Sequence, residues 1–251
     1  MPNWKKVITS GSDAHLNSLT INNGNLDLTG SLHVSSSNHS YFVGGGNERM
    51  RIDSSGNVGI GTTTPEALLH VSGAIYQSGL GYSTFLGYEA GKNDDKSNNY
   101  NTSVGHQALY SNTTGFYNTT QGYKSLYTNS GSHNTAQGHN SLYSNTTGGH
   151  NTAIGIESLS NNTTGTQNTA VGSFSLQANT TGADNTATGR GSLRSNTTGN
   201  YNIATGYYSL YSNTTGNYNT ATGYQSLYSN TTGTYNIAVG HRAGRYQSDD
   251  S

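Results

Sequence analysis

The chain contains no cysteine, only two prolines and few charged residues. The lack of cysteine and the low charge each exclude a class of protein. Without cysteine there is neither a disulfide framework nor a zinc–thiolate site. Charged residues make up 9% of the 251 positions and the formal net charge is −1, so the chain has no basic character that would bind nucleic acid or an acidic membrane surface. We therefore expect no nucleic-acid partner.

Apolar residues are also scarce, at 30% of the chain. No run approaches the roughly 18 consecutive apolar residues of a membrane-spanning helix, and residues 1–7 lack the apolar centre of a signal peptide. We expect neither membrane insertion nor conventional secretion, so that release from a host cell would follow lysis. Low hydrophobicity is typical of disorder only when net charge is high, and the strict periodicity described next favours an ordered fibre.

What the chain has in quantity is a 17-residue repeat, seen cleanly in residues 219–235. Copies begin at Asn101, Asn118, Asn134, Asn151, Asn168, Asn185, Asn202, Asn219 and Asn236. Self-similarity at a short fixed period is the signature of a stacked repeat architecture, and it outranks any local motif.

Two glycines recur in every copy, for example Gly223 and Gly233, and mark points of positive φ or close backbone approach. The segments between them are too short for packed helices. Thr-Ala-x-Gly and Ser-Leu-Tyr-Ser are rich in strand-forming residues, whereas Ser-Asn-Thr-Thr-Gly is turn chemistry. We predict two short strands per copy, each copy being one coil of an all-β solenoid or β-roll whose strands pair with their equivalents in the next coil.

Alternation along these strands predicts a thin core. Two columns should point inward, a leucine column and a small-residue column, and a third, mixed column is a candidate for another face that contacts neighbouring chains. They comprise Leu109, Leu126, Leu142, Leu159, Leu176, Leu193, Leu210 and Leu227; Ser103, Thr120, Ala136, Ala153, Ala170, Ala187, Ala204, Ala221 and Ala238; and Val104, Gln121, Gln137, Ile154, Val171, Thr188, Thr205, Thr222 and Val239. One leucine and one alanine per coil hardly offset the entropy of ordering the chain. Such a small apolar core favours a homotrimeric fibre, in which contacts between chains bury another face.

Residues 47–73, including Arg49-Met-Arg-Ile-Asp-Ser-Ser-Gly-Asn-Val-Gly-Ile-Gly61, resemble a segment of many phage tail-fibre proteins. Residues 3–12 are similar to the start of structural proteins of marine phages. The Asn-Thr-Ala-x-Gly-x-x-Ser-Leu copies resemble phage fibre repeats and, more loosely, the heads of trimeric autotransporter adhesins. The resemblance implies a homotrimeric fibre located in the virion tail. Its N-terminus would attach to other tail or baseplate proteins, with Trp4, Lys5 and Lys6 as docking residues.

The chain accordingly divides into five segments. Residues 1–18 form the docking segment, 19–45 hold short strands and turns (among them an apolar strand at Tyr41–Val43), and 46–82 are a trimeric β fibre segment with a linker. Residues 83–244 are the solenoid, with atypical copies at both ends and a charged turn after Gly91, and 245–251 are a tail.

The repeats offer little for catalysis or metal binding. Glu157 and Asp184 are the only acids in residues 101–244 and lie at different phases, so they do not make the carboxylate pair of a glycosidase. His106 and His139 share a column two coils apart, about 10 Å at the spacing of strands, which is too far for one ion. We expect no enzyme activity, no cofactor and no metal. The recurring Asn-Thr-Thr triplets match glycosylation sequons, but we interpret them as turns.

Tyrosines are the best candidates for contact with a receptor or glycan, because their amphipathic rings stack on sugars and hydrogen-bond to hydroxyls. The candidates are Tyr110, Tyr127, Tyr143, Tyr201, Tyr211, Tyr218, Tyr228 and Tyr235. Equally, the rings could stack on one another as ladders between coils, or fill a trimer interface. The middle copies lose them to Ser160, Gln177, Arg194, Gln167 and Asp184.

The favoured function is therefore a phage tail fibre that acts as a spacer and binds a host cell-surface glycan or protein. Three alternatives stay open: a bacterial surface adhesin, an ice-binding solenoid with threonine rows such as Thr186 and Thr188, and a purely structural spacer or collar protein.

Overall fold

The computed structural model describes residues 40–44, 47–71, 82–95 and 97–246, and within these ranges the protein is all-β, with fourteen strands and no helix. The chain divides into two compact units, residues 1–76 and 77–251. The docking residues Trp4, Lys5 and Lys6, and the strands expected between residues 19 and 39, lie outside the described residues.

The first unit contains a four-stranded sheet. Its strands are β1 (Ser40–Gly44), β2 (Asn47–Ile52), β3 (Val58–Ile60) and β4 (Leu69–Val71), in that spatial order. β1–β2 and β2–β3 pair antiparallel, whereas β3–β4 pair parallel. Asp53 shapes the β2–β3 turn, because its Oδ1 accepts the backbone N–H groups of Ser55 and Asn57 at 2.8 and 2.9 Å. β1 contains the apolar strand predicted at Tyr41–Val43.

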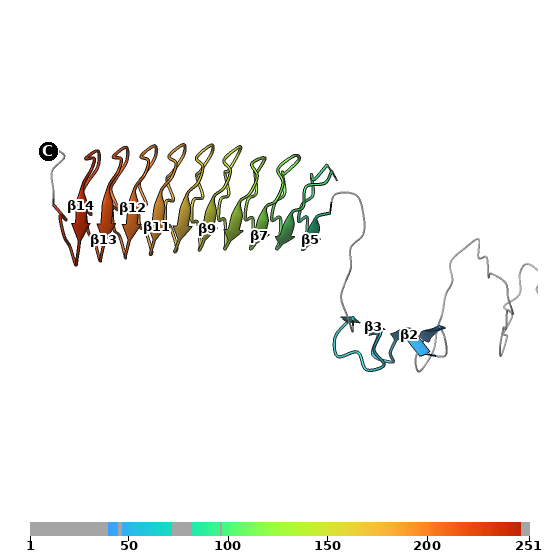
Figure 1. Ribbon diagram of the computed structural model, residues 1–251. Helices are drawn as coiled ribbons and strands as arrows, with labels where there is room; N and C mark the ends of the chain where they lie inside the picture. The colour runs from blue at the N-terminus through green and yellow to red at the C-terminus, as the bar shows by residue number, and fades with distance from the viewer. Residues whose placement is uncertain (1–39, 45–46, 72–81, 96, 247–251) are drawn as a thin grey trace, which may run out of the picture. The chain divides into compact units, whose positions relative to one another are not determined.

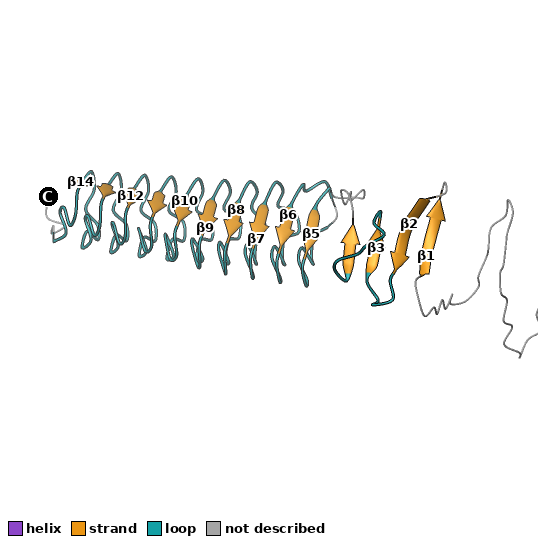
Figure 2. Cartoon of the chain, turned by 90° about the horizontal axis from the view of Figure 1, so that it is seen from below, coloured by secondary structure: helices purple, strands orange, loops and turns teal. Residues whose placement is uncertain are grey.

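The second unit is a parallel β-solenoid, and each coil contributes one short strand to a ten-stranded sheet along one side (Figures 1 and 2). The strands are β5 (Thr84–Leu86), β6 (Thr102–Val104), β7 (Thr119–Gln121), β8 (Thr135–Gln137), β9 (Thr152–Ile154), β10 (Thr169–Val171), β11 (Thr186–Thr188), β12 (Ile203–Thr205), β13 (Thr220–Thr222) and β14 (Ile237–Val239). Every strand pairs with its equivalents in register; Ala170, for example, lies opposite Ala153 and Ala187. The predicted pairing of equivalent positions is confirmed.

The second predicted strand, Ser-Leu-Tyr-Ser, is wrong. This arc is a series of turns, and every leucine of the column has a left-handed backbone with φ between 48° and 56°. Such residues bend the chain too tightly for a pleated strand. Hydrogen bonds between coils persist all the same: the N–H of Leu126 donates to the oxygen of Ser141 at 2.9 Å, and that of Thr128 to the oxygen of Tyr143 at 3.1 Å.

The interior of each coil is half apolar and half polar. All eight leucines are fully buried, as are the alanines of the small column from Ala136 to Ala221. Two asparagine columns and one serine column lie beside them, almost all with no exposed surface. The sequence-based estimate of the core omitted these polar columns. A single chain therefore closes its own interior, and the thinness of the alanine and leucine columns is no longer a reason to require a trimer.

The first asparagine column, at the start of each copy, ties each coil to the next. Asn168 shows the pattern: its Nδ2 donates to the carbonyl of Gly182 at 2.8 Å, and its Oδ1 accepts the backbone N–H of Asn185 at 3.1 Å. Because the side-chain amide satisfies buried backbone groups at both ends, burying it costs little.

The second asparagine column, in the Asn-Thr-Thr turns, forms a continuous side-chain ladder. Asn179 Nδ2 donates to Asn162 Oδ1 at 2.8 Å and to the carbonyl of Gly182 at 2.9 Å, so the two columns meet at one glycine. A Cβ on Gly165, the same position one coil earlier, would lie 2.4 Å from both Asn162 Oδ1 and the oxygen of Gly182. This series of glycines is required by close approach, whereas the other series has φ between 123° and 140°.

Candidate functional site

Three columns of aromatic rings run along the outside of the solenoid. Column A follows the first glycine of each coil, column B follows the leucine, and column C precedes the first asparagine. The rings are Tyr88, His106, Tyr123, His139, Tyr207, Tyr224 and His241 in column A; Tyr110, Tyr127, Tyr143, Tyr211 and Tyr228 in column B; and Tyr82, Tyr100, Tyr117, His133, His150, Tyr201, Tyr218 and Tyr235 in column C.

Rings in consecutive coils stack on one another. Their centroids lie 4.6–5.5 Å apart and their planes are mostly within 30° of parallel. In column B the Tyr110–Tyr127 and Tyr127–Tyr143 distances are 5.0 and 5.2 Å. The spacing follows from the roughly 4.8 Å between hydrogen-bonded strands. All candidate tyrosines of columns B and C belong to these ladders.

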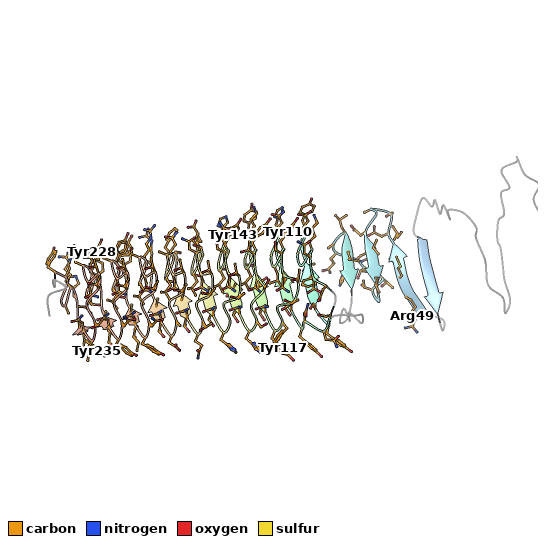
Figure 3. All side chains as sticks on the ribbon, turned by 90° about the horizontal axis from the view of Figure 1, so that it is seen from above. Arg49, Tyr110, Tyr117, Tyr143, Tyr228 and Tyr235 are labelled. Atoms are coloured by element: carbon orange, nitrogen blue, oxygen red, sulfur yellow. The ribbon has the colours of Figure 1, made fainter. Side chains whose placement is uncertain are left out.

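Stacking limits what these rings can contact. Inside a ladder both faces of a ring are covered, so a ligand meets ring edges and hydroxyl groups rather than ring faces. Column B is half-buried, whereas Tyr117 of column C is 52% exposed. Columns B and C lie on opposite sides of the solenoid, as Tyr143 and Tyr235 show in Figure 3. Column A adjoins column B, because Tyr208 contacts both Tyr207 and Tyr211, with centroids 4.1 and 4.9 Å away.

Columns A and B are interrupted in the coils that begin at Asn151, Asn168 and Asn185, and column C is interrupted in the first two of these. Column A holds Ile156, Ser173 and Arg190 there, column B holds Ser160, Gln177 and Arg194, and column C holds Gln167 and Asp184 before Tyr201. The interruption divides each ladder into an N-terminal and a C-terminal section.

A cluster of polar and aromatic side chains occupies the interruption on the side of columns A and B. We name it the arginine cluster; it comprises Phe174, Gln177, Arg190, Arg194, Tyr207 and Tyr208. Arg190 Nη1 donates to the hydroxyls of Tyr207 and Tyr208, at 2.8 Å each. Arg194 Nε donates to Gln177 Oε1 at 2.8 Å. Both guanidinium groups lie near the ring of Phe174, 5.9 and 5.2 Å from its centroid.

The arginine cluster shifts the pKa values of its two tyrosines in opposite directions. A hydrogen bond from Tyr207, assisted by the charges of Arg190 and Arg194, lowers the pKa of Tyr208, and the same hydrogen bond raises the pKa of Tyr207. The opposite directions follow from the hydrogen bond between the two hydroxyls, and the arginine charges are a smaller cause.

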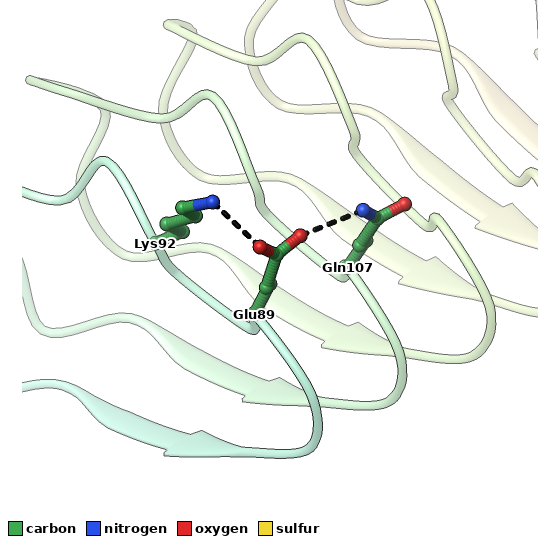
Figure 4. Close-up of polar contacts among 3 residues, drawn as sticks. All are labelled: Glu89, Lys92 and Gln107. Atoms are coloured by element: carbon green, nitrogen blue, oxygen red, sulfur yellow. Dashed lines mark hydrogen bonds and ion pairs between the residues drawn. The ribbon is translucent and has the colours of Figure 1, made fainter.

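A second polar contact lies in the first coil, where the sequence has its charged turn. Glu89 accepts from Lys92 and from Gln107 Nε2 of the next coil (Figure 4). These bonds lower the pKa of Glu89, with Lys92 the larger cause, and they raise that of Lys92. The contact joins the first two coils at their surface.

The acidic and histidine side chains of the described repeats make separate contacts. Glu157 accepts from Gln177 at 2.6 Å, and Asp184 belongs to column C, on the opposite side from column B. Sequence reasoning missed the closest histidine pair, His133 and His150, whose rings stack at 4.6 Å. Among the described residues no three potential metal ligands lie together. Nor does that part of the chain contain a helix long and apolar enough to span a membrane.

The arginine cluster was only partly visible in the sequence. Arg194 and Gln177 were noted as ring losses in column B, but Phe174 and Arg190 were not connected with them. The available signal was the simultaneous loss of rings from all three columns. Comparisons with protein-family models, with curated proteins and with solved structures found no match.

Proposed function

We propose that this chain is a non-enzymatic structural protein of a phage tail fibre, attached to the virion through its N-terminal region, and that its solenoid contacts the host cell surface. The observation that carries the proposal is the repeating outer surface: a rigid stack of equivalent coils displays aligned aromatic ladders on two sides. Such a surface suits repeated weak contacts with a polymer, whose individual affinities combine by multivalency.

The ladders favour carbohydrate as the contacted material. Their exposed parts are tyrosine hydroxyls and ring edges, which donate and accept hydrogen bonds with sugar hydroxyl groups. Tyr201, Tyr218 and Tyr235 present such edges in three consecutive coils and are 51, 48 and 74% exposed. In this proposal the tyrosines both stack between coils and contact glycan, because stacking orders the rings and leaves their polar edges outside.

We further propose that three copies assemble around a common axis. Apolar side chains remain exposed on the outer face of the solenoid sheet, where Ile237 and Val239 of β14 are 79 and 70% exposed. In the first unit Leu68 and Leu69 are 79 and 59% exposed beside a small sheet. Contact with a neighbouring copy would remove this apolar surface from water. Light scattering on the purified protein should give three times the 26.4 kDa chain mass, and a folded monomer would contradict this assembly.

Immunogold electron microscopy tests the function itself. Antibodies raised against residues 101–244 should label the tail fibres of particles that carry this chain, and the same antibodies should reduce adsorption of the particles to host cells. An antibody against the major capsid protein serves as the control. Labelling on bacterial cell surfaces would support the adhesin alternative, and fibre labelling without any effect on adsorption would support a pure spacer.

A further inference from the structure

The two arginines of the arginine cluster lie in the only described coil that has arginine in both column A and column B. Gly191, directly after Arg190, has φ of 66° and is buried beneath the ring of Tyr208. A Cβ on Gly191 would lie 2.4 Å from two carbons of that ring. The missing side chain thus lets the ring of Tyr208 pack against Gly191, with its hydroxyl 2.8 Å from Arg190 Nη1. The cluster is packed into a defined arrangement.

Arg190 and Arg194 each carry a permanent positive charge. Within the described residues neither forms an ion pair with a carboxylate. The nearest link is indirect, since Gln177 donates to Glu157 at 2.6 Å and accepts from Arg194. Arg190 uses only Nη1 toward protein acceptors, and Arg194 uses Nε and Nη1. Each guanidinium therefore keeps N–H donors for a ligand.

We infer that the arginine cluster binds an anionic saccharide, whose carboxylate or sulfate group is held by Arg190 and Arg194 while its hydroxyl groups bond to Tyr207 and Tyr208. Guanidinium groups hold carboxylates and similar oxyanions through paired, charge-assisted hydrogen bonds. The tyrosine hydroxyls beside them are already aligned by Arg190, so the hydrogen-bonding groups are arranged before the ligand arrives. The inference rests on the proposed attachment function and names the class of sugar.

The solenoid contains its own matched controls for general electrostatic attraction. Lys124 lies 5.3 Å from the ring centroids of Tyr123 and Tyr127, and Arg245, in column B like Arg194, lies 5.5 Å from that of Tyr228. Lys124 is the only lysine or arginine of its coil, whereas Arg245 shares the coil that begins at Asn236 with Arg242, which lies 5.8 Å from the ring centroid of Tyr224. The control therefore removes one cation from each of two separate coils, whereas the cluster variant removes two cations from one coil. Removing Lys124 and Arg245 changes the net charge of the chain as much as removing Arg190 and Arg194.

The test compares Arg190→Gln/Arg194→Gln with Lys124→Gln/Arg245→Gln in the full-length protein. Biolayer interferometry would measure binding to polygalacturonate, dextran sulfate and uncharged dextran, and circular dichroism would verify the fold of each variant. We expect the cluster variant to lose about tenfold or more in affinity for an acidic polysaccharide, because charge-assisted donors are removed. The control variant should stay close to the wild type. Polygalacturonate and dextran sulfate together show whether carboxylate or sulfate is preferred.

Arg190→Lys/Arg194→Lys adds a second readout, since it keeps both charges and removes the planar pairs of donors. It should bind more weakly than the wild type and more tightly than the glutamine variant. Equal losses in the cluster and control variants would overturn the inference in favour of diffuse charge attraction. Wild-type protein that binds dextran or host cells but neither acidic polymer would overturn the inference alone, and the attachment proposal would stand. Failure of attachment itself would appear as unimpaired adsorption under the antibodies described above.

Discussion

Replacing Asn168 with alanine should destabilise the solenoid much more than replacing an exposed asparagine of the preceding coil. Asn168 is fully buried and takes part in four side-chain hydrogen bonds. Its Oδ1 accepts from both the backbone N–H and the Nδ2 of Asn185, at 3.1 Å each. Its Nδ2 donates to the carbonyl of Gly182 at 2.8 Å and to Asn151 Oδ1 at 3.2 Å.

The size of the loss in stability depends on which partners of Asn168 are left without any hydrogen bond. Gly182 keeps the bond from Asn179 Nδ2, and Asn185 Nδ2 keeps its bond to Gly199 at 2.8 Å. Only the buried backbone N–H of Asn185 is orphaned, at a cost of about 1–3 kcal/mol. Loss of the bond to Gly182 adds about 0.5–1.5 kcal/mol. We therefore expect a loss of about 1.5–4.5 kcal/mol in the free energy of unfolding, with part of it arising locally.

Urea unfolding followed by circular dichroism would give the overall change, and hydrogen exchange with mass spectrometry would show where protection is lost. The control is Asn161→Ala, the same chemical change at an exposed position in the preceding coil. Faster exchange should be confined to coils near residues 168–185 and spare residues 101–117. If Asn168→Ala and Asn161→Ala unfold at the same urea concentration with equal protection, the buried asparagines are not what holds the coils together.

Three further predictions concern other contacts. Gly165→Ala should lower the free energy of unfolding by about 1–3 kcal/mol or more through overpacking, because the alanine Cβ would lie 2.4 Å from the oxygen of Gly182. Thermal unfolding would measure this loss. Tyr127→Ala removes two stacking contacts and should cost about 1–3 kcal/mol, whereas Tyr127→Phe should stay near the wild type; equal melting temperatures for the two would refute a stabilising ladder. The pKa of Glu89 is lowered, so its contribution to stability is present above the usual carboxyl pKa and is lost as pH falls through the folded value. Urea titrations should show a smaller loss on acidification in Glu89→Gln, and an unchanged pH profile would contradict the role of Lys92.

The repeat period carried most of the solenoid's architecture. A fixed period forces equivalent residues to stack, so in-register parallel pairing and the leucine column followed directly. The arc around the leucine did not follow, because strand propensity takes no account of a backbone that must turn. Leu126 and Leu227 have a left-handed backbone conformation, which leucine does not favour by itself. The need to close the coil imposes this conformation.

The buried asparagines were hidden by a similar ambiguity. Asparagine before threonine and glycine is common in exposed turns, and that local interpretation was reasonable for Asn179. Its burial depends on the carbonyl of Gly182 and the amide of Asn162, partners that the chain brings together only once the coil has closed. The arginine cluster was obscured in the same way, since Phe174 and Arg190 lie in different coils and different columns.

The asparagine ladders also explain how nearly identical coils keep a single register across an irregular copy. The coil that begins at Asn118 is one residue short, with Asn129-Ser-Gly131 in place of Asn-Thr-Thr-Gly. Asn129 nevertheless donates to Asn112 Oδ1 at 3.1 Å and accepts from Asn145 Nδ2 at 2.7 Å, so the ladder passes through the deletion. A slip of one residue in any coil would place threonine or serine where the amide must reach a glycine carbonyl, and it would leave buried backbone groups unsatisfied. An interior of leucine and alanine alone would resist such a slip only through packing. The polar half of the core therefore adds specificity of register, and it confines length variation to the two residues between the second asparagine and its glycine.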